Sequence, residues 1–129
     1  MKKKILLIGW EHHVWETMKT RELKGLAETF DIVFAQFNIR ALDEIAKAKF
    51  QDQNPIYALV FHRNILVGQP EKCKLIADFA SEYSKTSFIA INMIFNDQDR
   101  DARDYAVSAN FAQQGDWQQI AVIIDNSIK

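Results

Sequence analysis

Residues 5–9 read ILLIG, and residues 56–61 read IYALVF. Each is a short, nearly continuous apolar run, and the first ends at a turn-forming glycine. Such runs are typical of parallel strands covered on both faces, because neither face then needs polar side chains. The first run stops before Glu11, which is too short for the apolar region of a signal peptide. We therefore interpret it as a buried strand and expect a cytoplasmic protein.

Further apolar runs alternate with helical patterns on either side of these two strands. Strand-like runs lie at residues 31–37 (DIVFAQF), 87–93 (SFIAINM) and, as a short segment, 110–113. Apolar residues recur at helical spacing in five segments: Trp15 to Phe30, Leu42 to Ala46, Cys73 to Tyr83, Ala102 to Ala109, and Trp117 to Ile128. The first helical pattern is imperfect between Met18 and Leu23. Asp116 and Gln119 form a capping-box pattern ahead of the last helix.

This element order predicts an α/β fold of the type βαβαβαβαβα. Right-handed crossovers then give a doubly wound, five-stranded parallel sheet of order 2-1-3-4-5 in a three-layer α/β/α arrangement. The chain has 129 residues, of which 48% are hydrophobic and 26% charged, so it can bury a core and keep a polar surface. We expect a single domain over residues 1–129.

Composition argues against several classes of function. Sixteen basic and seventeen acidic residues give a net charge of -1, which does not favour direct binding of nucleic acid. Cys73 is the only cysteine, so neither an internal disulfide nor a thiolate zinc site is expected. The first loop reads GWEHHVW and lacks both dinucleotide-binding and P-loop glycines. The alternating Asp97, Asp99 and Asp101 lack the glycine and glutamate of a calcium loop. We expect no cofactor and no membrane association.

Ligands of this fold class bind outside the carboxyl ends of the strands, near the switch point between the first and third strands. The segments that follow the strands are residues 9–13, 62–64, 92–97 and 113–115. Any site of the predicted fold is therefore expected among these four segments.

The segments ILLIGWE, IYALVFH, FIAINM and SANFAQQGD, with the element order and the closing helix, resemble receiver domains of response regulators. The resemblance is one of layout and covers nearly the whole chain. Receivers end their first strand with two acidic residues that hold magnesium, whereas this chain has Gly9 and Trp10 there, and only Glu11 is acidic. The family's phosphorylated aspartate corresponds to His62.

Two further family positions also differ. The Ser or Thr at the end of the fourth strand corresponds to Asn92, and the Lys-Pro after the fifth strand corresponds to Gln114 and Gly115. Phosphoryl transfer to a carboxylate needs that carboxylate, a divalent cation and a positive group. All three are missing at the matched positions, so aspartyl phosphorylation there is excluded.

The resemblance implies a non-phosphorylatable pseudo-receiver and not an enzyme. Such an adaptor acts in signal transduction by binding a protein partner, and the resemblance leaves open whether it forms a homodimer. Its degenerate phospho-acceptor pocket would consist of Gly9, Trp10, Glu11, His62, Asn92 and Gln114. Receivers often bind partners through the face of their fourth helix, fifth strand and fifth helix. Here that face would run through Tyr105, Phe111 and Trp117, unless these aromatic side chains fill the core.

The three histidines support an alternative function. His12 and His13 follow the first strand and His62 follows the third, so their imidazoles meet at one sheet edge if the predicted order holds. With Glu11 or Glu16 they would suit a transition metal or a proton-transfer set, in a small metal- or ligand-binding domain or an enzyme. That alternative predicts three convergent imidazoles. The adaptor predicts an exposed apolar or aromatic patch and no preformed pocket at the strand ends.

Overall fold

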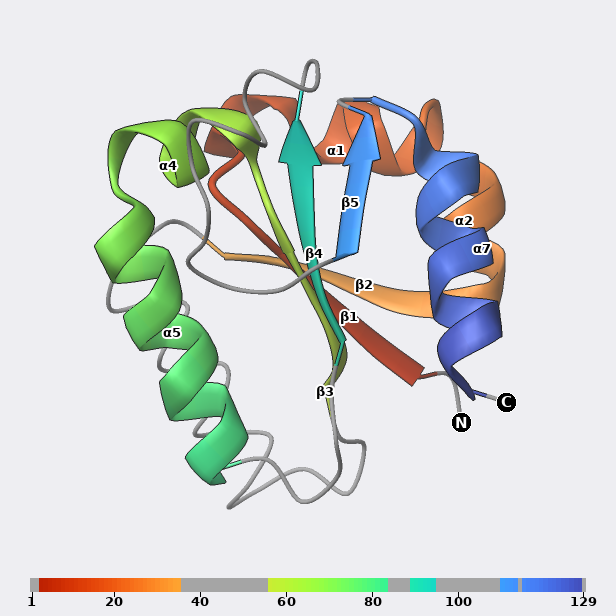
Figure 1. Ribbon diagram of the computed structural model, residues 1–129. Coiled ribbons are helices and arrows are strands. Elements are labelled where there is room, and N and C mark those ends of the chain that lie inside the picture. The colour runs from red at the N-terminus through yellow and green to blue at the C-terminus, as the bar shows by residue number, and fades with distance from the viewer. Residues whose placement is uncertain (1–2, 36–55, 84–88, 95–109, 114, 129) are drawn as a thin grey trace.

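The structure, a computed structural model, describes residues 3–35, 56–83, 89–94, 110–113 and 115–128. Five strands form one sheet in the order β2-β1-β3-β4-β5, and every neighbouring pair is parallel (Figure 1). The predicted α/β class and strand order 2-1-3-4-5 are therefore confirmed. The strands are β1 (Lys3–Ile8), β2 (Phe30–Ala35), β3 (Ile56–Phe61), β4 (Ile89–Ile94) and β5 (Asn110–Gln113).

Helices cover both faces of this sheet. On one face lie α1, α2 and α7, and on the other lie α4 and α5 (Figure 1). Their bounds are η1 (His12–Val14), α1 (Trp15–Thr20), α2 (Lys24–Thr29), α4 (Arg63–Gly68), α5 (Pro70–Tyr83) and α7 (Trp117–Ile128). The helical patterns predicted at Leu42 to Ala46 and Ala102 to Ala109 fall outside the described residues. Among the described helices, none combines the length and apolar character needed to cross a bilayer.

Each face of the sheet has its own hydrophobic core. Ile5 and Leu7 point into the core beneath α1, α2 and α7, which we call the α7-side core. Leu6 and Ile8 point into the core beneath α4 and α5, the α5-side core. All four side chains have no exposed surface. The apolar run of β1 thus alternates between two cores, as its lack of polar residues predicted.

The first helical pattern is broken into two short helices. The α1 helix ends at Thr20, and α2 begins at Lys24. Across the break, the Leu23 N–H donates to the Met18 carbonyl over 2.8 Å. Residues five apart do not share a face in a continuous helix, but this break lets Met18 and Leu23 both enter the α7-side core. The pattern's end was placed wrongly, because Phe30 is the first residue of β2 rather than helical.

The start of α7 is fixed by two side chains. The Asp116 Oδ1 atom accepts a hydrogen bond from the Gln119 N–H at 3.0 Å, which confirms the predicted N-cap. The reciprocal bond of a capping box is not formed. Instead, Gln119 Oε1 accepts from the Gln113 N–H at 2.9 Å, and the Asp116 N–H donates to the Gln113 carbonyl. Gln119 therefore ties α7 to the end of β5.

Replacing Asp116 by Ala should lower the free energy of unfolding by about 1 kcal/mol, because the Gln119 N–H loses its acceptor. Urea denaturation followed by circular dichroism measures this change. The matched control is Asn126→Ala, at an exposed position later in α7, which should change stability by less than about 0.5 kcal/mol. Equal effects of the two substitutions would show that the cap contributes nothing.

Candidate functional site

The carboxyl ends of β1 and β3 lie side by side, and the first residue after each strand donates a backbone hydrogen bond to the last residue of a neighbouring strand. The His62 N–H donates to the Ile8 carbonyl over 3.0 Å, and the Gly9 N–H donates to the Ala35 carbonyl over 3.3 Å. The sheet edge therefore brings Gly9, Trp10 and His62 together, as the sequence predicted. These three residues form the centre of the candidate site.

Gly9 turns the chain sharply at the end of β1. Its φ of +107° belongs to a region that side chains disfavour. A Cβ at this position would lie 2.5 Å from Ile65 Cγ1 and 3.0 Å from His62 Cβ. Any side chain here would be strained by the backbone and would also overlap α4. Close packing of the β1 loop on α4 therefore requires glycine.

His62 caps the amino end of α4. Its Nδ1 atom accepts a hydrogen bond from the Asn64 N–H at 3.0 Å. An imidazole nitrogen accepts only when it carries no proton, so this bond requires the neutral ring with its proton on Nε2. Desolvation by burial, followed by the charge of Arg63, lowers the pKa of His62, and Glu11 opposes this shift. Geometry and environment thus both favour neutral His62.

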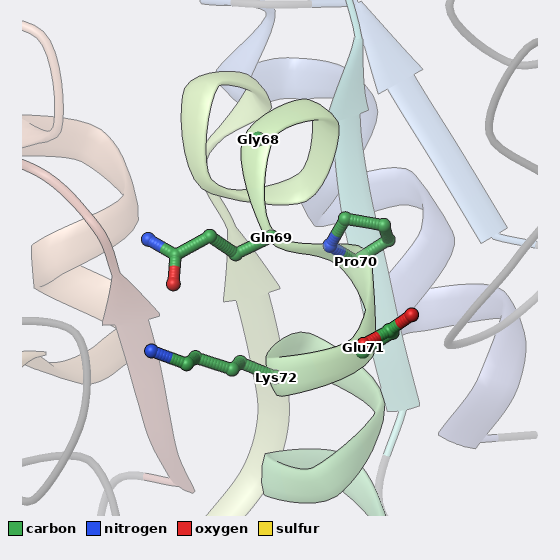
Figure 2. A pocket seen from close by; sticks show the side chains of 5 residues that line it. All are labelled: Gly68, Gln69, Pro70, Glu71 and Lys72. Atoms are coloured by element: carbon green, nitrogen blue, oxygen red, sulfur yellow. The ribbon is translucent and has the colours of Figure 1, made fainter.

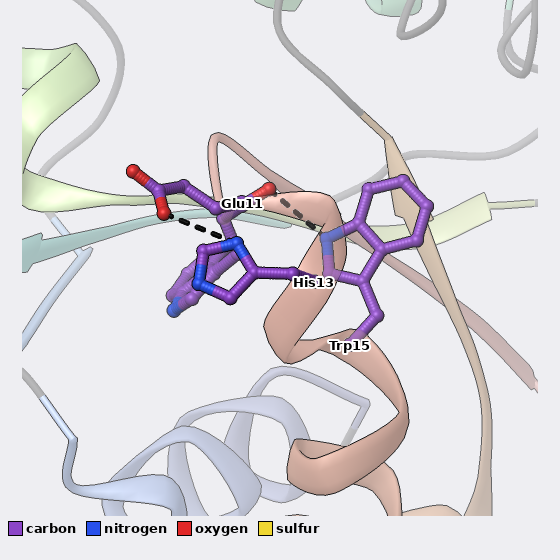
Figure 3. Close-up of polar contacts among 4 residues, drawn as sticks. Glu11, His13 and Trp15 are labelled. Atoms are coloured by element: carbon purple, nitrogen blue, oxygen red, sulfur yellow. Dashed lines mark hydrogen bonds and ion pairs between the residues drawn. The ribbon is translucent and has the colours of Figure 1, made fainter.

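Trp10 fills the space next to His62. The indole is 7% exposed and belongs to the α7-side core. Its ring meets the His62 ring edge to face at 4.8 Å and the Trp117 ring at 5.7 Å and 45°. The Trp10 carbonyl accepts a hydrogen bond from Trp15 Nε1 at 3.0 Å (Figure 3). A large apolar side chain thus occupies the position where the expected pocket would open.

The other two histidines take separate positions. His12 and His13 are both exposed on η1. The His12 ring lies 4.6 Å from the Trp15 ring. His13 Nδ1 lies 3.4 Å from Glu11 Oε2 (Figure 3). In the part of the chain that the structure describes, no group of three His, Cys, Asp or Glu side chains is placed to hold one metal ion. This geometry gives no support to the three-imidazole arrangement.

Asn92 lies deeper in the sheet than His62. In the strand register it pairs with Phe61 on one side and Phe111 on the other. Its neighbours Ile91 and Met93 belong to the α7-side core, so by alternation Asn92 points toward α4 and α5. The side chain is 1% exposed. Asn92 is therefore a buried polar residue on the face of the sheet opposite to Trp10.

The predicted interaction face is described only in part. Phe111 is half-buried against the α5-side core, and Trp117 is half-buried against the α7-side core. Tyr105, as well as Gln114 of the predicted pocket, lies outside the described residues. The two described aromatic side chains therefore pack against different cores.

Cys73 has the structural role expected from its helical position. It lies on α5 with no exposed surface and packs in the α5-side core. Burial raises the pKa of its thiol to about 12. The side chain is thus a protonated, apolar packing group.

A small hollow lies where α4 meets α5. It has a volume of about 280 Å³ and is lined by the consecutive residues Gly68–Lys72. Gln69 and Lys72 extend to one side of the chain and Glu71 to the other (Figure 2). Because all its walls come from one short segment, polar groups from separate elements do not converge there.

A second hollow is a groove of about 340 Å³ between α2 and α7. Trp117 lines it, so the ring that touches Trp10 also reaches this groove. Sequence reasoning missed the groove, because α2 and α7 come from opposite ends of the chain. One signal was present: Gly25 interrupts an otherwise helical pattern without ending it.

Gly9→Ala should destabilise the protein by at least about 1 kcal/mol, because alanine meets both an unfavourable φ and the side chain of Ile65. Gly25→Ala is the matched control. Gly25 is helical, and a Cβ there meets nothing within 4 Å, so alanine should stabilise by about 0.5–1 kcal/mol. Urea denaturation of both variants checks the opposite signs, and a neutral Gly9→Ala would contradict the close packing on α4.

Stability should fall as pH drops below 6.5, the ordinary pKa of histidine, and toward the lower pKa of folded His62. In that interval the unfolded chain binds a proton that folded His62 resists, so protons favour unfolding. His62→Asn keeps an acceptor for the Asn64 N–H but removes the titration. Its unfolding free energy should therefore depend less on pH between 6.5 and 5 than that of the wild type. If the unfolding free energy of His62→Asn differed between pH 7.5 and pH 5 as much as that of the wild type, this assignment would be contradicted. His12→Asn is the control and should keep the pH dependence of the wild type.

No family model matches the sequence, and a search of curated proteins finds no match. The candidate site is therefore interpreted from its own geometry.

Proposed function

We propose that this domain is a non-phosphorylatable pseudo-receiver that acts in signalling or regulation by binding a protein partner, without catalysing a reaction. The observation that carries this proposal is the position of Trp10. In this fold class the carboxyl edge of the sheet is the usual place for a small-molecule ligand. Here the indole of Trp10 occupies that edge between His62 and Trp117. Filling by a core side chain leaves recognition to the outer surface.

The residues around Trp10 support the same proposal. Gly9 stands where the resemblance to receivers assigns one of the two metal-binding acids. A carboxylate side chain there would have to begin at a Cβ that overlaps Ile65. His62 stands at the phospho-acceptor position, and its Nδ1 is engaged by the Asn64 N–H. These positions therefore serve packing and capping rather than phosphoryl chemistry.

The metal-binding alternative gains no comparable support. In the described geometry, His12 packs on Trp15, His13 faces Glu11, and His62 caps α4. Each imidazole thus has its own local contact, and no single centre joins the three.

Partner binding should be independent of phosphoryl donors. Lysine-directed crosslinking in an extract of cells that naturally produce the protein, followed by mass spectrometry, should yield one reproducible partner. Exposed lysines on both faces report the covered surface, because Lys24 lies on α2 and Lys74 on α5. The crosslink yield in the extract should be the same with and without acetyl phosphate and magnesium. The intact mass of the purified chain should also not change under this treatment.

Two outcomes would contradict the proposal. One is a phosphoryl adduct at a residue of the candidate site that alters the crosslinks. The other is the lack of any reproducible crosslink from either lysine while the domain itself stays folded. A Trp10→Asp variant is not a suitable control, because a carboxylate in the α7-side core would compromise folding.

A further inference from the structure

The groove between α2 and α7 is lined by residues of both helices. The α2 side contributes Glu22, Gly25, Leu26 and Thr29, and the facing side belongs to α7. Two of the lining residues, Gly25 and Ala121, contribute little side-chain volume. A Cβ on Gly25 would meet nothing within 4 Å. The small residues therefore leave the groove open.

The floor and one wall of the groove are apolar. Leu26 and Phe30 are 9% and 5% exposed and form the floor. The half-buried indole of Trp117 forms a wall at the start of α7. The Trp117 ring also packs against the Trp10 ring, at 5.7 Å between ring centroids. The groove thus offers a fixed aromatic surface above an aliphatic floor.

Two carboxylates line the groove. The α2 helix leads into β2 and α7 follows β5, and both lie on the same face of the sheet (Figure 1). Glu22 comes just before α2, and Asp125 lies about two helical turns after Trp117 on α7. Both carboxylates are exposed, and the described residues that line the groove include no lysine or arginine. The charge of the lining is therefore uniformly negative.

Gly25 lowers the stability of α2, and packing within the domain does not require a glycine there. Gly25 is exposed in the first turn of α2, and glycine in a helix is less stable than alanine by up to about 1 kcal/mol. It has an ordinary helical conformation and touches no neighbour that would exclude a Cβ. The open space above Gly25 therefore belongs to the groove and is not required by packing within the domain.

From these features we infer that the groove binds an exposed segment of the protein partner that carries an arginine next to apolar residues. The guanidinium lies against the Trp117 indole and donates to the Glu22 carboxylate, since both a ring face and a carboxylate favour arginine. The aliphatic stem and flanking apolar side chains cover Leu26 and Phe30. A second basic group of the segment would reach Asp125. This inference rests on the proposed function and specifies the surface that function uses.

The test uses the intact chain and two capped peptides, acetyl-Ala-Leu-Arg-Leu-Ala-amide and the same peptide with citrulline in place of arginine. Citrulline has the shape of arginine without its charge. In ¹H–¹⁵N NMR titrations, the arginine peptide should shift the Trp117 indole N–H and the amides of α2. The citrulline peptide should bind about tenfold more weakly, because the charge-assisted hydrogen bond is lost.

Three variants separate the site from the rest of the surface. Glu22→Gln should weaken binding of the arginine peptide about tenfold and abolish its preference over citrulline. Gly25→Leu should fill the groove and remove binding while α2 remains helical. Glu28→Gln, which changes the same charge on α2 but does not line the groove, should bind like the wild type.

Equal binding of the two peptides, or unchanged binding by Gly25→Leu, would overturn the inference. Chemical-shift changes confined to the amides of α5 would overturn it as well. Crosslinks to a partner that come from Lys74 rather than Lys24, together with no peptide binding, would place the interface elsewhere. In that case the proposed function would stand and only the groove would be excluded.

Discussion

The structure depends on the burial of β1 on both of its faces. This strand pairs with β2 on one side and β3 on the other, and residues 5–8 have no exposed surface. A parallel strand in that position needs helices above and below it, which is why α1, α2 and α7 cover one face and α4 and α5 the other. Because the strands are parallel, their carboxyl ends all emerge at one edge. The meeting of Gly9, Trp10 and His62 follows from that geometry.

What this chain places at the edge differs from what the fold usually holds there. The positive φ of Gly9 lets the loop turn onto α4, and Trp10 then enters the core between His62 and Trp117. His62 contributes through two contacts, its ring against Trp10 and its Nδ1 on the Asn64 N–H. Both contacts are compatible with a neutral imidazole, whose burial lowers its pKa. Gly9, Trp10 and His62 thus contribute packing and capping at this edge.

The sequence was most informative where local pattern and tertiary environment agree. The bounds of β3 were predicted as observed, because a short apolar run buried in a parallel sheet leaves a clear signal. The bounds of β5 were also predicted as observed, although Gln113 is exposed, because a parallel crossover needs room for a helix before the strand. The break between α1 and α2 was not predicted, since it depends on Met18 and Leu23 entering the same core. At the site, adjacency of the first and third strand ends was predictable from topology. The filling of that edge by Trp10 was not, because the direction of a loop side chain depends on Gly9 and on contacts with α7.

The same contacts that close the strand edge also fix the groove. Trp117 is the first residue of α7, whose start is held by the Asp116 cap and by the Gln119 bond to the end of β5. Its ring packs on Trp10 on one side and borders the groove beside Glu22 on the other. A surface whose side chains are already ordered loses little conformational entropy on binding, so more of the contact energy appears as affinity. The proposed partner segment would therefore bind beside a closed strand edge, on a surface whose aromatic wall is already held in place by Trp10.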